Sequence, residues 1–399
     1  MRAVIQQLPG SKIREVANAG LSRSDVLAFW FGESDEPTPE FVRAAAAESL
    51  ARGETFYSHN LGLSELREAI ARYTSRLHRP LSAERVAVTS SGVSALMIAM
   101  QALVGADDEV VVVVPVWPNL PAQPAILGAR VTRFALEVRD GDWRLDLPAL
   151  LGTVTERTRV LLVNSPNNPT GWTLTRDEQL AILAHCRRTA TWIVADEVYE
   201  RIWFGGCAGA AGDPVAPSPG KTVGLAAPSF LDIAEADDRL VVAHSFSKSF
   251  LMTGWRLGWM VAPVELLDAI GKLIEFNTSC APVFVQRGGL AGLAQADLFV
   301  PGLVERLRAC RDTLVPRLAA LPGVRVAMPP GGMYAFFRVE GQDDSLAFAK
   351  RLVIEAGLGL APGAAFGGES EGWLRWCFAS RDPSRLEQGV QRLAGALRL

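Results

Sequence analysis

Short apolar strands that alternate with helical segments constrain this chain more strongly than any other feature of its sequence. They recur between about residue 84 and residue 263. The run Glu109–Val114 is almost entirely valine, which is typical of a strand buried on both faces. Strands interleaved with helices indicate βαβ units and a mostly parallel sheet. We therefore predict an α/β protein whose strands include Arg85–Thr89, Glu109–Val114, Val160–Asn164, Trp192–Asp196, Leu240–Ser245 and Leu257–Val261.

The pattern changes after about residue 285. There a long helix precedes a mixture of strands and shorter helices, which indicates a smaller α+β domain. Residues 205–236 break the alternation, and their Gly, Ala and Pro content predicts a long surface excursion. The predicted C-terminal helices are Phe299–Leu321, Ser345–Glu355 and Pro383–Leu397, and the predicted strands are Val324–Met328, Met333–Val339 and Trp373–Phe378.

Composition argues against several classes of protein. The 40 basic and 43 acidic residues give a net charge of −3, so no global basic field attracts nucleic acid or an acidic membrane. The apolar runs fall far short of the about 18 residues of a membrane span, and the first residues lack the apolar core of a signal peptide. We therefore expect a cytoplasmic protein. Five cysteines without a CxxC pair and four widely separated histidines predict neither a disulfide framework nor a metal site.

Lys248 is the most informative basic residue, because only five of the 40 basic residues are lysines. It stands in the sequence SFSKS directly after the predicted strand Leu240–Ser245, and Arg256 follows eight residues later. This position predicts a side chain at the carboxyl edge of the sheet, where open α/β sheets bind ligands. A solvated surface lysine and arginine remain an alternative.

Four further motifs are each ambiguous. Asn168 lies in the rigid turn SPNNPTG, and Asp196 and Tyr199 lie in ADEVYE at the end of an apolar strand. The turn SSGVSA offers free N–H groups at a helix start, which suit a phosphate, and Trp117 follows the valine strand. Taken singly, these residues could be a bare turn, a helix cap and a core aromatic. Neither a GxGxxG nor a GxxxxGK[ST] motif occurs.

The order of these motifs resembles the class I/II, aspartate aminotransferase-like aminotransferases, which are fold type I pyridoxal-phosphate enzymes. The matching stretches are NLGLSELREAI, SSGVSAL, NSPNNPTG, ADEVYE, SFSKSFLMTGWRLGW and LRWCFAS, and they extend from about residue 30 to the end. The resemblance implies a large cofactor-binding domain with a mostly parallel sheet at 46–285 and a small α+β domain at 286–399. It also implies that the N-terminal segment 1–45 packs with the small domain.

The resemblance assigns roles around pyridoxal 5'-phosphate. Lys248 would bind the cofactor aldehyde as a Schiff base and carry a proton during the reaction. Asp196 would hold a proton on the pyridine nitrogen, and Tyr199 and Asn168 would bind the phenolic oxygen. Trp117 would stack on the ring. The phosphate would be held by Val93, Ser94, Ser245 and Arg256, and by Tyr57 of a second subunit, which implies a homodimer.

The same resemblance implies a substrate site. Arg375 would bind the α-carboxylate through both ends of its guanidinium, together with Asn168 and the backbone of Gly32. The implied activity is transamination between an amino acid and a 2-oxo acid in two half-reactions. Val93 replaces a lysine that binds the distal carboxylate in one subgroup, so we expect neutral, apolar or aromatic donors rather than aspartate. The basic segment Ser11–Glu15 cannot be placed from the sequence.

Two alternatives remain open at this stage. A β-lyase, decarboxylase or cyclase of the same fold would carry similar cofactor residues, because the rest of the site decides which bond breaks. A non-enzymatic cofactor-binding module would need an added DNA-binding domain. We expect this second alternative to be wrong, because only about 30 residues precede the motif region and the net charge is negative.

Overall fold

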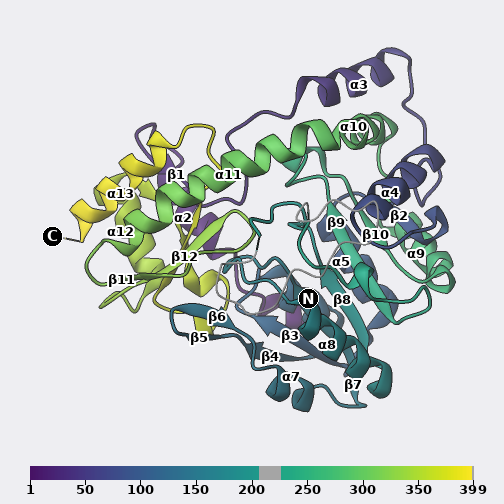
Figure 1. Ribbon diagram of the computed structural model, residues 1–399, viewed down its shortest axis with the longest axis horizontal. Helices are drawn as coiled ribbons and strands as arrows, with labels where there is room; N and C mark the ends of the chain where they lie inside the picture. The colour runs from purple at the N-terminus through teal and green to yellow at the C-terminus, as the bar shows by residue number, and fades with distance from the viewer. Residues whose placement is uncertain (206–225, 398–399) are drawn as a thin grey trace.

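A seven-stranded sheet forms the centre of the computed structural model, which describes residues 1–205 and 226–397 (Figure 1). All neighbouring strands pair in parallel except β10, which is antiparallel to both of its neighbours. The predicted mostly parallel α/β fold is confirmed. The strand order is β2 (Val86–Thr89), β10 (Gly258–Val261), β9 (Leu240–Ser245), β8 (Trp192–Asp196), β7 (Thr158–Asn164), β3 (Glu109–Val114) and β4 (Arg130–Ala135).

The valine run of β3 shows why both faces of the sheet are apolar. Val110, Val112 and Val114 pack in one cluster with α5, α6 and α9, whereas Val111 and Val113 pack in another with α4, α8 and α10. Successive side chains of a strand point to opposite faces, so helices must cover both. These helices are α4 (Ser64–Leu77), α5 (Gly92–Leu103), α6 (Asn119–Leu127), α8 (Arg176–Thr189), α9 (Val264–Thr278) and α10 (Val283–Ala294).

A second, antiparallel sheet lies at the other end of the molecule (Figure 1). Its strand order is β11 (Val324–Val326), β12 (Tyr334–Val339), β15 (Trp373–Cys377) and β14 (Ala361–Pro362), and α12 (Ser345–Ala356) and α13 (Ser384–Ala396) pack with it. Two elements of the N-terminal segment join this end: β1 (Leu27–Ala28) pairs with β13 (Leu358–Gly359), and α2 (Lys12–Gly20) contributes Ile13 and Val16 to the same core.

One long helix, α11 (Ala296–Ala319), belongs to both ends of the molecule. Ala296 and Val300 pack with the large sheet, whereas Leu303 through Leu318 pack with the small one. The domain boundaries near residues 45 and 285 therefore stay predictions. The remaining elements are α1 (Ala3–Gln6), α3 (Glu40–Ala51), α7 (Leu147–Thr153), β5 (Glu137–Arg139), β6 (Asp142–Arg144) and the short 3₁₀ turns η1 (Ala83–Arg85), η2 (Phe230–Asp232), η3 (Thr253–Trp255), η4 (Gly363–Ala365) and η5 (Gly368–Ser370).

The predicted surface excursion at 205–236 is wrong in the part that the structure describes. Residues 206–225 lie outside the described residues, but Phe230, Leu231 and Ile233 are buried in the core of the large sheet. These apolar residues pack in the core. The sequence prediction missed this because the Gly and Pro content of the residues just before them dominates the composition of the stretch. In the described part of the chain, no helix is both long enough and apolar enough to cross a bilayer.

Candidate active site

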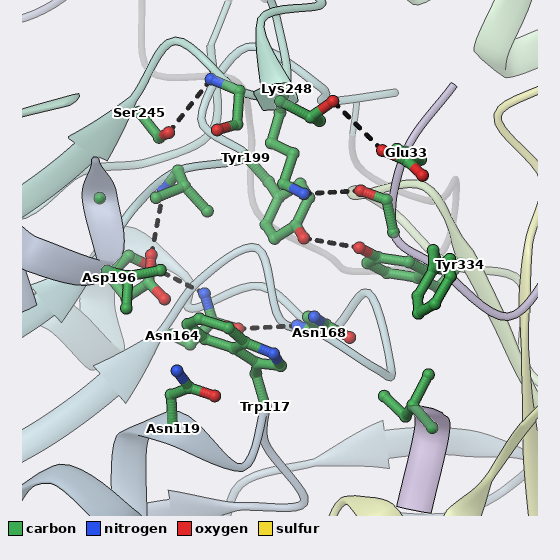
Figure 2. A pocket seen from close by; sticks show the side chains of 18 of the residues that line it. Glu33, Trp117, Asn119, Asn164, Asn168, Asp196, Tyr199, Ser245, Lys248 and Tyr334 are labelled. Carbon is green, nitrogen blue, oxygen red and sulfur yellow. Dashed lines mark hydrogen bonds between the residues drawn. The ribbon is translucent and has the colours of Figure 1, made fainter. Parts of the chain in front are cut away.

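A cavity of about 680 Å³ opens at the carboxyl edge of the large sheet, next to the N-terminal segment and the small sheet (Figure 2). Ten of the twelve residues predicted from the sequence line it. Tyr57 and Ser94 do not. The lining residues predicted from the sequence are Gly32, Val93, Trp117, Asn168, Asp196, Tyr199, Ser245, Lys248, Arg256 and Arg375.

Lys248 lies at the centre of this cavity, in the turn after β9 (Figure 2). Its Nζ donates a hydrogen bond of 2.6 Å to the Gly32 carbonyl and lies 5.7 Å from the centre of the Tyr199 ring. Burial lowers the pKa of Lys248 to about 8, because desolvation disfavours the charged amine. An amine with this pKa is partly unprotonated close to neutral pH, as a nucleophile or a base must be.

Asp196 ends β8 and faces the same cavity with a buried carboxylate. Oδ1 accepts a hydrogen bond from the Val198 N–H at 3.3 Å, and among the described residues no cation lies within ion-pair distance. Burial raises the pKa of Asp196 to about 7, against the opposing effect of Lys248. A buried carboxylate with so little compensation is suited to hold a cationic N–H group.

Tyr199 hydrogen-bonds to a tyrosine that sequence reasoning missed. Its hydroxyl lies 2.7 Å from that of Tyr334, the first residue of β12, and the two rings meet edge to face (Figure 2). Burial raises the pKa of Tyr199 well above its ordinary value. A Cβ on Gly32 would lie 2.1 Å from the Tyr334 hydroxyl oxygen, so a side chain there would displace the pair. Tyr334 therefore fixes both Tyr199 and the backbone near Lys248.

Arg375 and Asn168 both line the cavity and contact each other. Arg375 Nη1 donates to Asn168 Oδ1 at 2.9 Å, and Nη2 donates to the Trp30 carbonyl at 2.6 Å. The guanidinium is buried against the rings of Tyr334 and Phe366, and its Nε has no hydrogen-bond partner in the described structure. A buried donor without a partner is costly, and a carboxylate that enters the cavity can satisfy it.

The first turn of α5 supplies a place for a second anion. Gly92 and Val93 line the cavity beside Ser245 and Arg256. A Cβ on Gly258 of β10 would lie 2.5 Å from the Gly92 nitrogen, so glycine at 258 permits this close approach. The Ser94 N–H already donates to the Ser91 hydroxyl at 3.0 Å, so the anion-binding role predicted for this amide is partly taken up by a helix cap.

Tyr57 lies outside the cavity, with 88% of its surface exposed. Sequence reasoning also missed the lining residues Asn119, Asn164 and Arg14. Asn164 could have been found, because it ends an apolar strand just as Asp196 does. Its side chain donates to the Asp196 carbonyl at 2.9 Å and accepts from the Asn168 N–H at 2.7 Å, so it ties the two predicted motifs together.

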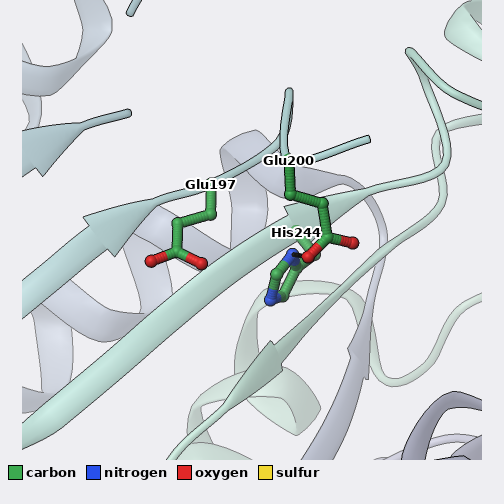
Figure 3. Close-up of side chains that lie close together, drawn as sticks. All are labelled: Glu197, Glu200 and His244. Atoms are coloured by element: carbon green, nitrogen blue, oxygen red, sulfur yellow. Dashed lines mark ion pairs between the residues drawn. The ribbon is translucent and has the colours of Figure 1, made fainter. Parts of the chain in front are cut away.

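A buried charge cluster lies beside this site, formed by Glu197, Glu200 and His244 (Figure 3). Glu197 and Glu200 directly follow the cavity residues Asp196 and Tyr199 in the sequence, and His244 directly precedes Ser245. The Ser229 hydroxyl and Phe230 N–H donate to Glu197. Glu200 lies 3.2 Å from Nε2 of His78, and Asp232 lies 3.1 Å from Nδ1 of the same histidine. Burial alone would lower the pKa of His78, but these two carboxylates raise it to about 10. The acids therefore have protein partners, and we assign no metal to the cluster.

The fold and the cavity together define an α/β enzyme with a lysine at its centre and separate positions for two anionic groups. Residues 24–393 match the family described as aminotransferase class I and II, and the chain belongs to that family. It is 32% identical to an aspartate aminotransferase of Thermotoga maritima over 98% of this chain and 97% of that protein.

Solved structures agree with this assignment. A mutant aspartate aminotransferase of Thermus thermophilus superposes with a TM-score of 0.87 at 28% identity, over 99% of each chain. An aromatic aminotransferase of Pyrococcus horikoshii superposes with a TM-score of 0.84 at 27% identity, over 96% of this chain and 98% of the other. The relatives act on different amino acids, so the family establishes an aminotransferase but leaves the donor open.

Proposed function

We propose that the protein is a pyridoxal 5'-phosphate-dependent aminotransferase that moves an amino group between an amino acid and a 2-oxo acid. The observation that carries this proposal is the presence of Lys248 and Asp196 in one cavity: a buried amine with a pKa of about 8, and a buried carboxylate that has no ion-pair partner among the described residues. The cofactor, when bound, supplies an aldehyde that reacts with amines and a protonated ring that accepts electrons from the substrate.

The cavity residues fit this group. The carboxylate of Asp196 would bind the ring N–H, which satisfies a charge that the protein leaves nearly uncompensated. The phosphate would lie at the first turn of α5 with Ser245 and Arg256. Tyr199 and Asn168 would bind the phenolic oxygen, and the Trp117 ring would stack on the cofactor.

Arg375, Asn168 and Gly32 would bind the amino acid through its α-carboxylate. Two aromatic rings pack against the guanidinium and restrict its movement, so a carboxylate bound there would place the α-carbon at a fixed position relative to Lys248. Lys248 would then move a proton at that carbon. Its pKa of about 8 leaves part of the amine unprotonated at neutral pH, which proton abstraction requires.

The finer features remain proposals. Val93 lines the cavity and carries no charge, which supports neutral or aromatic amino donors. Tyr57 is 88% exposed and lies outside its own cavity, as expected for a residue that reaches the phosphate site of a second subunit in a homodimer. The expected cytoplasmic location stays a prediction.

Spectroscopy of the loaded enzyme tests the proposal. An amino donor should convert the cofactor from its aldehyde-derived absorbance to that of the amino form, and a 2-oxo acid should reverse this change. Borohydride should attach the cofactor to the peptide that contains Lys248. Lys248→Ala should abolish turnover in a folded protein, whereas Lys272→Ala, at an exposed lysine paired with Asp268, should leave it unchanged. Regeneration of the aldehyde form with release of another product would indicate a lyase or decarboxylase instead.

A further inference from the structure

The charges that line the cavity are not all used by the proposed function. Four side chains are cationic and two are acidic: Arg14, Lys248, Arg256, Arg375, Glu33 and Asp196. Cofactor and α-carboxylate together would engage all but Arg14 and Glu33. Glu33 accepts a hydrogen bond from the Thr253 hydroxyl at 3.2 Å. Arg14 is therefore the cavity cation that still lacks a role.

Arg14 is placed by the first turn of α2. The Ser11 hydroxyl caps this helix by accepting from the Arg14 N–H at 3.3 Å, and Ser11 and Ile13 also line the cavity. Lys12, in the same turn, does not line it. Within residues 1–205 and 226–397, no carboxylate pairs with Arg14. Its guanidinium carbon lies 5.8 Å from the centre of the Phe31 ring.

Phe31 contacts Arg14 and is also adjacent, along the chain, to the two residues that hold Arg375 and Lys248. Its two neighbours hold the central cations by their carbonyls: Trp30 accepts from Arg375, and Gly32 accepts from Lys248. A substrate with its α-carboxylate on Arg375 and its α-carbon near Lys248 can direct its side chain past Phe31. Arg14 lines the same cavity and lies next to Phe31.

We propose that Arg14 is a specificity-determining residue that pairs with the side-chain carboxylate of a dicarboxylic co-substrate. This inference rests on the proposed function and identifies the 2-oxo acid of the second half-reaction as a dicarboxylate. Val93 provides no charge for that carboxylate, and Arg14 does. The guanidinium is exposed, so a neutral side chain leaves it hydrated at little cost, and neutral amino donors remain acceptable.

The test compares two acceptors in one half-reaction. The amino form of the holoenzyme is mixed with 2-oxoglutarate or with pyruvate, and the return of the aldehyde absorbance gives kcat/KM for each. Arg14→Gln should lower the value for 2-oxoglutarate about tenfold or more, as expected for loss of a partly exposed charge-assisted bond. The value for pyruvate should change less than about twofold. Arg14→Lys should recover part of the loss, and Lys12→Gln, the matched control, should change neither acceptor.

Each other outcome is decisive. Equal losses for both acceptors in Arg14→Gln would show a structural role and overturn the inference, as would no loss for either. If Lys12→Gln lowered kcat/KM for 2-oxoglutarate as much as Arg14→Gln does, the total positive charge of the segment would be the cause, and the inference would also be overturned. If the wild type transfers no amino group to any acceptor, the proposed function itself fails, and the absorbance of the wild type reveals this before any variant is made.

Discussion

Replacement of Asp196 by asparagine should stabilise the cofactor-free protein at alkaline pH. The carboxyl has a pKa of about 7 in the folded protein, against an ordinary value of 3.8. Below pH 3.8 it is neutral in both the folded and the unfolded chain and has no effect on stability. Between pH 3.8 and 7 the unfolded chain is ionised while the folded one stays protonated, so folding stability falls as pH rises.

The size of this loss follows from the pKa. A change from 3.8 to about 7 corresponds to about 4 kcal/mol, because each unit is worth about 1.4 kcal/mol. The loss is complete above pH 7. Asparagine does not titrate, so the variant should exceed the wild type by about 2 kcal/mol at pH 5 and about 4 kcal/mol at pH 8. In the loaded enzyme the advantage should vanish, because under the proposed function the ring N–H would compensate the carboxylate.

Denaturant unfolding of the cofactor-free proteins at the two pH values measures this difference. Asp238→Asn provides a control of opposite sign. Although burial raises the pKa of Asp238, hydrogen bonds from Arg187 and the Glu235 N–H outweigh it and hold the pKa below its ordinary value, so this variant should be less stable than the wild type at pH 8. A stability difference for Asp196→Asn that is equal at pH 5 and pH 8, or that favours the wild type at pH 8, would refute the reasoning.

Two further substitutions address the walls of the cavity. Gly32→Ala should lower kcat at least about tenfold because its Cβ meets the Tyr334 hydroxyl at 2.1 Å. Steady-state assays should show partial recovery in Gly32→Ala/Tyr334→Phe and no effect of Gly10→Ala, whose Cβ meets nothing within 4 Å; failure of the double variant to recover would count against the clash. Arg375→Leu should raise KM for every amino donor together by about 100-fold, since all carry the α-carboxylate, and a loss confined to one donor would contradict this role.

Much of the fold could be predicted from local sequence. The strands Glu109–Val114, Trp192–Asp196 and Leu240–Ser245 were predicted with the observed bounds, because short apolar runs rich in β-branched residues end there at polar or proline residues. Helix α5 begins at Gly92, inside the SSGVSA motif, because the Ser91 side chain caps it there. The strand predicted to reach Met328 ends at Val326, where its pairing with β12 ends.

The site could be predicted only where a local motif carries the residue. Tyr199 and Tyr334 are 135 positions apart, and no pattern in the sequence joins their hydroxyls. Arg14 has the same difficulty: its position over Phe31 depends on how the N-terminal segment packs against the small sheet. Histidines that are far apart in the sequence also meet in space: His78 and His244 lie 3.2 Å and 3.5 Å from the carboxylate of Glu200.

The carbonyls of Trp30 and Gly32 hold Arg375 and Lys248 without cancelling their charge. A dipole orients a cation, whereas a carboxylate would neutralise it. The cavity therefore keeps an electropositive interior in a chain whose net charge is −3. Anionic molecules approach against a weakly repulsive surface and are attracted only near the entrance, so their association rate should fall as salt screens the local field. Because the interior is electropositive, inorganic anions such as phosphate should compete for the empty site. The dependence of the association rate on ionic strength thus follows from the two carbonyl oxygens that hold Arg375 and Lys248 without neutralising them.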